Sequence, residues 1–517
     1  MKGFLRLLRA EWTKLRTVRG WALGLAAGAL LILAFGLTPS RQGSCGQNGP
    51  GSECTPLHGP SGQEVSDSFT FVHRTLTGDG TVTARIAGLT GVIDDGAGGQ
   101  KEHLVPWAKA GLIVKDGTTQ GSAYGAVMLT GEHGVRLQYG YDHDEGHAAD
   151  AAIRPQPMWL RLTRTGDVLK AERSADGAAW TTVGTARVPG LPATVTAGLF
   201  VTSPQYSERV NQGVVLSGVQ GGPSEATATF DHLATAGSWS PDWEGTVIGP
   251  HPGPGDGGGG GPAGGHTARA AGPQAGFEPT ADGWSLTGSG DIAPAASGAS
   301  GGGVTVSQTL IGTFVGLIAV VVIGAMFITA EFRRGLIRTT FAAAPRRGRV
   351  LAAKALVLGG VTFVLGLAAA WVVVAFGVDV LRDNGVYVHP ATAATEARVV
   401  VGTAALLAGC AVLAVGLGTL LRRGVTAVTV SVVVVVLPYL LSVTVLPLRA
   451  ADWLLSVSPA AAFAMQQSEP RYDQIDNIYS PADGYFPLGA WSGLAVLALW
   501  IAVVYAAAVT NLRRRDA

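Results

Sequence analysis

The sequence predicts a membrane protein that combines six transmembrane helices with an extracellular all-β sandwich domain, inserted between the first and second helices. Three observations support this fold class. Of the 517 residues, 47% are hydrophobic and only 14% are charged, whereas soluble domains carry about 25% charged residues. Basic residues gather in short clusters between long apolar runs. Between the first run and the others lies a long stretch of short, alternating strand-like segments.

The N-terminus is predicted to be an amphipathic helix followed by a span. Residues 1–20 alternate basic side chains with Phe, Leu and Trp, a pattern typical of a helix at the inner membrane surface. The uncharged run 21–37 is long enough to cross the membrane with help from its flanks. A cleaved signal peptide is the alternative, but the basic segment is long and no clear A-x-A cleavage site follows the apolar run before Arg41. We therefore expect residues 1–20 to stay attached as a cytoplasmic helix.

Five further apolar runs predict a five-helix membrane domain over residues 309–517. The runs cover residues 309–330, 351–377, 399–421, 425–447 and 489–510. The terminal segments and the loops on their side carry 18 Lys and Arg residues, against four in the short loops on the opposite side. Because basic loops stay in the cytoplasm, both termini are predicted to be cytoplasmic and residues 38–308 extracellular, in a multi-pass protein of the plasma membrane.

The predicted spans show packing features and few charges. Pro438 predicts a kink in the fifth span, because proline removes a helix hydrogen bond. Small residues at a spacing of four favour close helix packing. They are Gly20, Gly24 and Gly28 in the first run and Gly312 and Gly316 in the second. The middles of the spans hold essentially no ionisable side chains, which disfavours a proton-coupled carrier or a charge-selective channel.

The inserted segment is expected to have three parts. Residues 38–63 form a neck, and residues 64–235 contain the strand-like segments, enough chain to enclose a β-sandwich core. Residues 236–308 are rich in Gly and Pro and predict a flexible tether. Within the tether, residues 277–294 are a patch that could be ordered against the membrane domain.

Two of the three cysteines, Cys45 and Cys54, lie in the neck. In an oxidising compartment they would close a small disulfide loop, and the alternative is a pair of exposed thiols. Cys410 lies within an apolar run and is predicted to serve in packing. No cysteine spacing resembles a zinc site.

Three stretches resemble permease subunits of type-two ATP-binding-cassette exporters, with the actinobacterial branch as the nearest likeness. They are LRAEWTKLRTVRGW at the start, EFRRGLIRTTFAAAPRRGRVLAAK in the basic loop and LRRRDA at the end. The resemblance covers residues 1–37 and 304–517. It implies a transport subunit that works with a separate ATPase subunit and with a second permease chain, identical or different.

In that family, the N-terminal helix and the basic loop dock on the ATPase. The residues at the matching positions are Glu11, Glu331, Arg333, Arg334 and Arg338. The arginines would offer planar forks to carboxylates of the partner. The alternative is that they only enforce topology and bind membrane lipid head groups.

The inserted segment departs from the plain family pattern, in which the first outer loop is short. Its phrases WAKAGLIVKDG, WLRLTRTGDVLKAERSADGAAWTTVG and VTAGLFVTSP resemble concanavalin-like β-sandwich domains. Such lectin-like domains bind sugars, bind nothing or occasionally hydrolyse, so the likeness implies a fold more than a function.

The sequence contains few motifs that indicate nucleotide binding, metal binding or catalysis. It lacks the G-x-x-x-x-G-K-[ST] loop that holds ATP phosphates, so ATP would be bound by the partner subunit, and we expect no cofactor in this chain. Asp142, Asp144 and Glu145 are weak candidates for a metal site, and a solvated hairpin is the favoured alternative. A glycosidase pair of Glu132 with Asp142 or Asp144 is not supported, because sequence does not set the distance between carboxylates.

Aromatic residues give one further hint. Trp107, Trp159 and Trp180 lie in strand patterns and would suit a sugar-stacking face, although strand aromatics more often belong to a core.

We predict that the chain is a permease subunit of an ATP-driven exporter and not an enzyme. The outer domain would serve capture, recognition or shielding, with a glycan as a possible ligand there, and we expect no nucleic acid partner. A membrane-anchored carbohydrate-binding or sensor protein is the alternative, and a surface hydrolase a third reading. The transported cargo is not readable.

Overall fold

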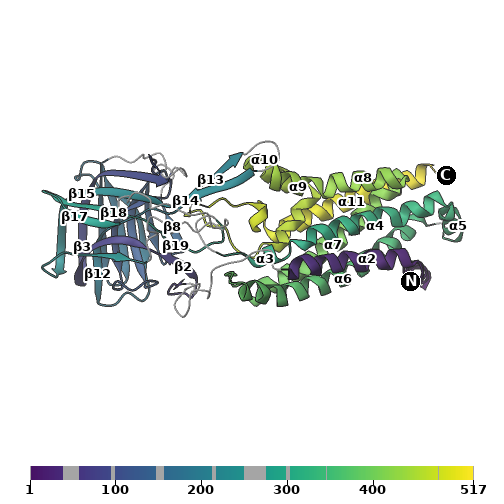
Figure 1. Cartoon of the computed structure of the whole chain (residues 1–517), viewed down its shortest axis with the longest axis horizontal. Helices are drawn as coiled ribbons and strands as arrows, with labels where there is room; N and C mark the ends of the chain where they lie inside the picture. The colour runs from purple at the N-terminus through teal and green to yellow at the C-terminus, as the bar shows by residue number, and fades with distance from the viewer. Residues whose placement is uncertain are drawn as a thin grey trace.

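The computed structural model shows an elongated molecule with a β domain at one end and a helical bundle at the other (Figure 1). The described residues are 2–38, 57–94, 99–146, 157–211, 217–249, 275–298, 303–344, 346–475 and 477–515. We call residues 57–298 the inserted domain. The basic end is the end of the bundle that lies away from this domain and carries both termini (Figure 1).

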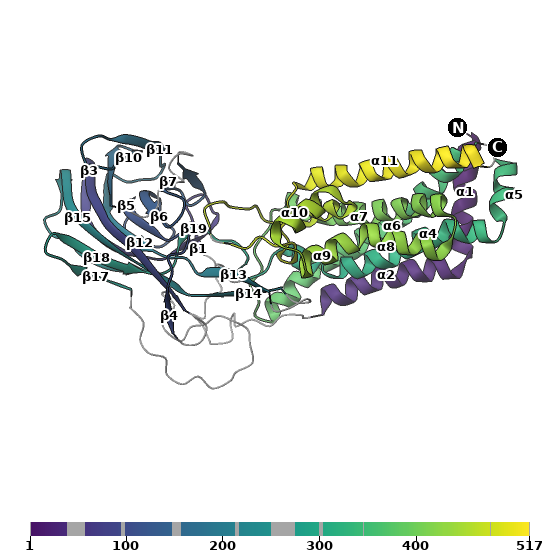
Figure 2. The ribbon, with the colours of Figure 1, turned by 90° about the horizontal axis from the view of Figure 1, so that it is seen from above.

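The first two helices meet at a sharp corner. Helix α1 (Lys2–Thr17) ends before Val18, which is extended with φ −86° and ψ 95°, and α2 (Arg19–Leu37) begins directly after it. In Figure 2, α1 lies across the basic end while α2 runs along the bundle. This is the arrangement expected of a surface helix followed by a span.

The remaining helices form the bundle and its short connections. They are α3 (Val306–Thr309), α4 (Gly312–Arg333), α5 (Leu336–Ala343), α6 (Arg347–Asp383), α7 (Ala393–Leu421), α8 (Gly424–Val435), α9 (Leu437–Thr444), α10 (Leu448–Val457) and α11 (Ala490–Arg515), with 3₁₀ turns at Pro459–Gln466 and Pro481–Asp483. Among the described residues, five helices are long and apolar enough to cross a membrane, or six if the bent pair α8–α9 counts as one span. The predicted helical membrane fold is confirmed.

Two local features of the spans follow from single residue types. The chain bends by 42° between α8 and α9, beside Pro438, as predicted. Helix α2 packs closely on α4 because glycines leave room: a Cβ on Gly316 would lie 2.5 Å from the Ile32 side chain, and one on Gly28 would lie 3.3 Å from Ala319. Gly20 has no such neighbour within 4 Å.

The inserted domain is built almost entirely of antiparallel strands. They are β1 (Leu57–His58), β2 (Glu64–Asp67), β3 (Phe69–Asp94), β4 (Gln100–Glu102), β5 (Lys109–Lys115), β6 (Tyr124–Thr130), β7 (Val135–Tyr139), β8 (His143–Glu145), β9 (Met158–Thr165), β10 (Val168–Ser174), β11 (Thr181–Arg187), β12 (Thr194–Thr202), β13 (Tyr206–Asn211), β14 (Ser217–Gly222), β15 (Ser224–Trp239), β16 (Glu244–Ile248), β17 (Gly276–Pro279), β18 (Gly283–Gly288) and β19 (Ile292–Pro294).

Strand β3 organises this domain, because two predicted strands merge into one long strand that turns from one layer to the other. Its first part pairs with β12 and β16, and its second part pairs with β9 and β15. The main sheet order is β11-β10-β9-β3-β12-β5-β6-β7-β8. Alternating residues such as Leu112, Val127, Leu160 and Leu199 fill the core between the layers, with no more than 1% of each exposed. The predicted sandwich-like all-β domain is confirmed.

The expected tether at 236–308 needs correction. Strand β15 runs through the predicted boundary at 235, and β16 and β18 pair with β3 and β15. Residues 250–274 lie outside the described residues, but in the chain they connect one strand of the inserted domain to another. The patch 277–294 is ordered against this domain: Leu286 of β18 is buried in its core, because the segment alternates as a strand does.

Two buried lysines of β5 fasten the chain segments that join the inserted domain to the bundle. Lys115 Nζ lies 2.7 Å from Asp67 Oδ2 on β2, which leads in from α2, and Lys109 Nζ lies 2.6 Å from Asp291 Oδ1 beside β19, which leads out to α3. Strands β2 and β19 also pair with each other. Both lysine side chains are fully buried, so each ion pair is held in one geometry. The entry and exit of the domain are therefore fixed to its sheet.

Candidate functional site

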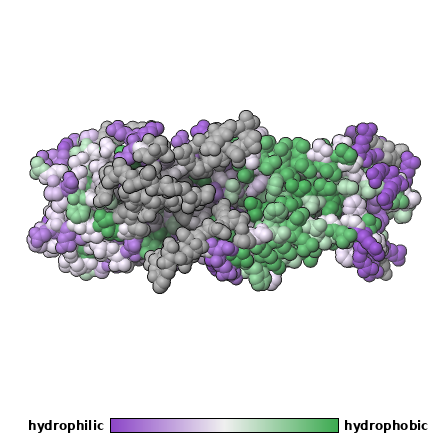
Figure 3. All heavy atoms as spheres, in the orientation of Figure 1, coloured by the Kyte–Doolittle hydropathy of each residue, from purple (hydrophilic) through white to green (hydrophobic). Residues whose placement is uncertain are grey.

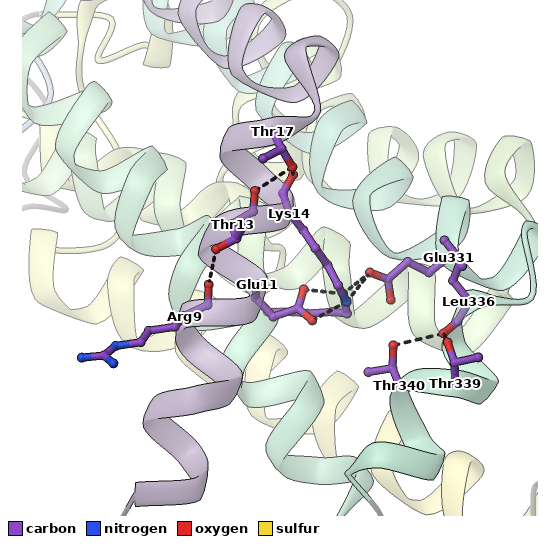
Figure 4. Close-up of polar contacts among 10 residues, drawn as sticks. Arg9, Glu11, Thr13, Lys14, Thr17, Glu331, Leu336, Thr339 and Thr340 are labelled. Atoms are coloured by element: carbon purple, nitrogen blue, oxygen red, sulfur yellow. Dashed lines mark hydrogen bonds and ion pairs between the residues drawn. The ribbon is translucent and has the colours of Figure 1, made fainter.

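The basic end holds a buried cluster of four charged side chains, which we call the ion cluster. It consists of Glu11 and Lys14 on α1, Glu331 on α4 and Lys354 on α6. The N-terminal helix α1 therefore meets α4 and α6, two helices of the C-terminal half of the chain, at one point. Figure 4 shows Glu11, Lys14 and Glu331 pointing toward one another from α1 and α4.

Lys354 is the centre of the ion cluster. Its Nζ lies 2.6 Å from Glu11 Oε2 and 2.6 Å from Glu331 Oε1, and its side chain is fully buried. The ammonium also lies 5.0 Å from the centre of the Phe327 ring, an arrangement that favours a cation. Lys354 therefore ties α6 to α1 and α4 at once.

Lys14 closes the ion cluster from the water side. Its Nζ donates to Glu11 Oε1 at 2.8 Å and to Glu331 Oε1 at 3.1 Å. Burial opposes the charge of Lys14, but the hydrogen bond to Glu11 and the negative charge of Glu331 outweigh it and raise its pKa above the ordinary lysine value. Two ammonium groups thus face two carboxylates and the formal charges cancel, which is the condition under which buried ions are tolerated.

The structure gives Glu11 and Glu331 a different place from the one expected. Both were predicted to face an ATPase, but both belong to the ion cluster, and Glu11 is 1% exposed. Their carboxylates are directed at lysines of the same chain. Direct contact with a partner through these carboxylates would require the ion cluster to open.

The three predicted arginines are on the surface. Arg333 and Arg334 end α4, and Arg338 lies on α5, all exposed. Gly335 between them has φ +68°, a left-handed conformation that glycine adopts without strain and that lets the chain turn from α4 into α5. Helix α5 stands at the basic end beside α1 (Figure 2). The arginines are thus presented together on an exposed corner.

Further arginines of the chain segments at the basic end are also exposed. They are Arg6, Arg9, Arg16, Arg19, Arg346, Arg349, Arg423, Arg513 and Arg514. Figure 3 shows hydrophilic patches at the basic end, next to a hydrophobic band on the face of the bundle in view. The basic end is therefore a strongly positive surface.

Sequence reasoning missed Lys14 and Lys354 as partners of the carboxylates. Lys354 carried a signal, because a lysine just inside an apolar run is costly unless it is paired. Glu11 and Lys14 also have the i, i+3 spacing of a helical ion pair. Neither signal identifies Glu331 as the common partner, because that depends on how α1 crosses α4 and α6.

The acidic candidates of the inserted domain are paired within it. Asp144 accepts hydrogen bonds from Arg136 and from Gln138, and Glu145 accepts one from the Tyr139 hydroxyl at 2.9 Å. Asp142 contacts only His143 at 2.7 Å among the ion pairs of the described residues. Among those residues, no three His, Cys, Asp or Glu side chains converge on a point where a metal would sit.

The three tryptophans do not form one open face. Trp107 is buried and stacks on His133 at 4.0 Å. Trp159 packs near His232, and Arg161 lies 3.7 Å over the ring of Trp180. The cysteines Cys45 and Cys54 lie outside the described residues, and Cys410 is a buried free thiol.

Comparisons with known proteins agree with the helical part. The family model described as "ABC-2 family transporter protein" matches residues 125–517, which include part of the inserted domain. No protein with a curated description matches the chain.

Some solved structures resemble the chain locally. A functionally unknown protein from Saccharomyces cerevisiae is 14% identical, with a TM-score of 0.20, over 32% of this chain and 73% of that one. A GH43 protein from Bacillus licheniformis is 12% identical, with a TM-score of 0.19, over 31% and 28% of the two chains. Scytalido-glutamic peptidase is 12% identical, with a TM-score of 0.23, over 44% and 99%. These scores are too low to carry an argument about this chain.

Proposed function

The chain belongs to the ABC-2 family of transporter proteins, and on that premise we propose that it is the permease subunit of an ATP-driven exporter. The family makes it a multi-pass membrane subunit of an ABC transporter. The proposal has three parts. The transporter exports its cargo, a separate ATPase subunit supplies the energy, and a second permease chain is the partner in the membrane. The ATP would be bound by the ATPase, because this chain has no phosphate-binding loop.

The ion cluster is the observation that best supports coupling to an ATPase. It fixes α1 across the basic end and joins it to α4 and α6 through Lys354. Force applied to α1 or α5 would then reach two long helices through short, charge-assisted contacts, which hold their geometry well. Glu11 and Glu331 act in this proposal as positioning residues, and Arg333, Arg334 and Arg338 supply the surface that meets the partner.

The distribution of exposed aromatic and basic residues supports the membrane orientation. Trp453 and Trp491 are 66% and 69% exposed near the inserted domain, and Trp12 is 48% exposed at the basic end. Tryptophan favours both membrane–water interfaces, and basic residues favour the cytoplasmic side. We therefore propose that the basic end lies in the cytoplasm and the inserted domain outside the cell.

The inserted domain is proposed to capture, recognise or shield material outside the membrane, without hydrolase activity. The buried pairs Lys109–Asp291 and Lys115–Asp67 attach both of its chain connections to its sheet. A domain held in this way moves with the helices that it joins. This replaces the expectation that residues 236–308 form a flexible tether.

The test is charge reversal on the exposed corner. We expect the triple variant R333E/R334E/R338E to insert normally but to lose co-purification with the ATPase encoded nearest to this chain, since partner carboxylates would meet like charge. The matched control is R513E/R514E, which reverses exposed arginines of the same end that lie on α11 and not on α4 or α5. Wild-type recovery of the ATPase with the triple variant, or equal loss with the control, would contradict the proposed docking surface.

A further inference from the structure

A buried histidine joins the inserted domain to the helical bundle. His389 lies in the loop between α6 and α7, and 6% of its side chain is exposed. Its Nδ1 is 2.7 Å from Glu64 Oε2 on β2 and 3.7 Å from Glu469 Oε1, in the segment between α10 and α11. We call these three residues the junction triad. It links the start of the inserted domain to two separate loops of the bundle.

The two carboxylates of the junction triad are held in place by other donors. Glu64 Oε1 accepts from the Tyr387 hydroxyl. Glu469 Oε2 accepts from the Tyr485 hydroxyl at 2.7 Å and from the Ser297 backbone N–H at 3.2 Å. Ser297 belongs to the chain that leaves the inserted domain, so both connections of the domain are attached here. The carboxylates cannot easily turn away from each other.

One carboxylate oxygen of the junction triad accepts no hydrogen bond from the described residues. Glu469 Oε1 is buried and has no hydrogen-bond partner among the described residues. His389 Nδ1 lies 3.7 Å from this oxygen and already serves Glu64 at the shorter distance of 2.7 Å. A neutral imidazole has one N–H to give, and leaves two carboxylates facing each other with no compensating charge in the triad. A protonated imidazole would place a positive charge between them.

Other ionisable groups face the junction triad from each packed element. His58 on β1, Tyr387 after α6, and Tyr472 and Tyr485 before α11 interact with its carboxylates. Arg382 at the end of α6 and Asp483 before α11 act in turn on Tyr387 and Tyr485. Burial would raise the pKa of Glu64, but the hydrogen bonds from His389 and Tyr387 outweigh it and lower that pKa below the ordinary value. Glu64 is therefore an anion over the whole neutral range.

We propose that the junction triad is a proton-binding site: the imidazolium of His389, held between Glu64 and Glu469, clamps the inserted domain onto the bundle, and loss of that proton loosens the clamp. The inserted domain would then respond to the pH of the side on which it lies. This property concerns the chain alone and holds whether or not the proposed ATPase binds.

The pH range in which the junction is tight follows from the direction in which Glu64 and His389 each lose their contribution. Glu64 has a lowered pKa, so its contribution is present above the ordinary glutamate value of about 4.3 and is lost as the pH falls through the lowered value. The contribution of the His389 imidazolium has the opposite sign, because it is lost when the ring gives up its proton as the pH rises. The junction is expected to be tightest in mildly acidic solution.

The test uses the full chain in nanodiscs and measures hydrogen–deuterium exchange of the β2 and β19 amides, corrected for the intrinsic effect of pH. We expect protection in the wild type to fall about tenfold between about pH 6 and about pH 8.5, as for loss of one charge-assisted hydrogen bond. His389→Gln should remove this pH dependence. Glu469→Gln should keep the junction protected at the higher pH, because one of the two facing charges is gone.

The matched control is His143→Gln, because His143 also contacts a carboxylate, that of Asp142, but is 55% exposed. It should keep the wild-type pH dependence. An unchanged pH dependence in His389→Gln, or unchanged loosening at high pH in Glu469→Gln, would overturn the proposal. Should His389→Gln fail to fold, the Glu469→Gln comparison still decides the question, since it leaves the histidine in place.

Discussion

Replacing Lys354 by Met tests the ion cluster most directly. Methionine keeps the length and the apolar stem of the side chain but removes the ammonium that lies 2.6 Å from both Glu11 and Glu331. Lys14 remains, but its side chain is 40% exposed and it sits at the edge of the ion cluster. Two largely buried carboxylates would then share one partly hydrated cation.

The size of the effect follows from the burial of the partners. Removing one member of a buried ion pair costs about 3 to 5 kcal/mol, because the other charge stays buried without compensation. Since Lys14 still offers partial compensation, we expect the lower limit of about 3 kcal/mol for keeping α1 in place. At about 1.4 kcal/mol for each factor of ten, opening of α1 becomes about a hundredfold more frequent.

Hydrogen exchange of the α1 amides in nanodiscs measures this opening. In Lys354→Met, we expect exchange along α1 to be about a hundredfold faster, with the inserted domain unaffected. Adding Glu331→Gln restores the charge balance and should recover most of the protection. The matched control is Lys170→Met, which removes a surface pair of 2.7 Å with Glu172 and should cost less than about 1 kcal/mol. Unchanged exchange in Lys354→Met, or no recovery in the double variant, would refute the reasoning.

Three further predictions concern other parts of the chain. The fragment 57–298 should be secreted as a soluble, β-rich unit with one cooperative melting transition, whereas the fragment 60–240 should aggregate because it lacks β18 and β19; equal behaviour of the two would contradict the strand pairing. Protection of α1 should be constant through neutral pH and fall above about pH 10.5, because Lys14 has a raised pKa and its contribution is lost when it deprotonates; a fall near neutrality would count against this. On intact cells, an impermeant thiol reagent should label a cysteine placed at Gly177 but not one at Gly348, and the reverse pattern would invert the proposed topology.

Much of the fold could be predicted from local patterns. Apolar runs of sufficient length mark the spans because a membrane demands them, and the bend beside Pro438 follows from one missing hydrogen bond. Alternating residues mark the strands of the inserted domain because one face of each strand is buried. These features depend on neighbours in the sequence, so the sequence alone determines them.

The tertiary structure decided which distant residues meet. Glu11 and Lys354 are 343 positions apart and lie 2.6 Å from each other only because α1 turns across the ends of α4 and α6. The Gly-rich run was read as a tether to the membrane because composition does not show that β17, β18 and β19 return to the sheet, where Lys109 needs Asp291 as its counter-ion. Glu64, His389 and Glu469 are likewise joined by packing alone. A charge can be recognised in a sequence, but the residue that pairs with it is set by the tertiary structure. Here these pairings hold α1 against α4 and α6, and hold the inserted domain against the bundle.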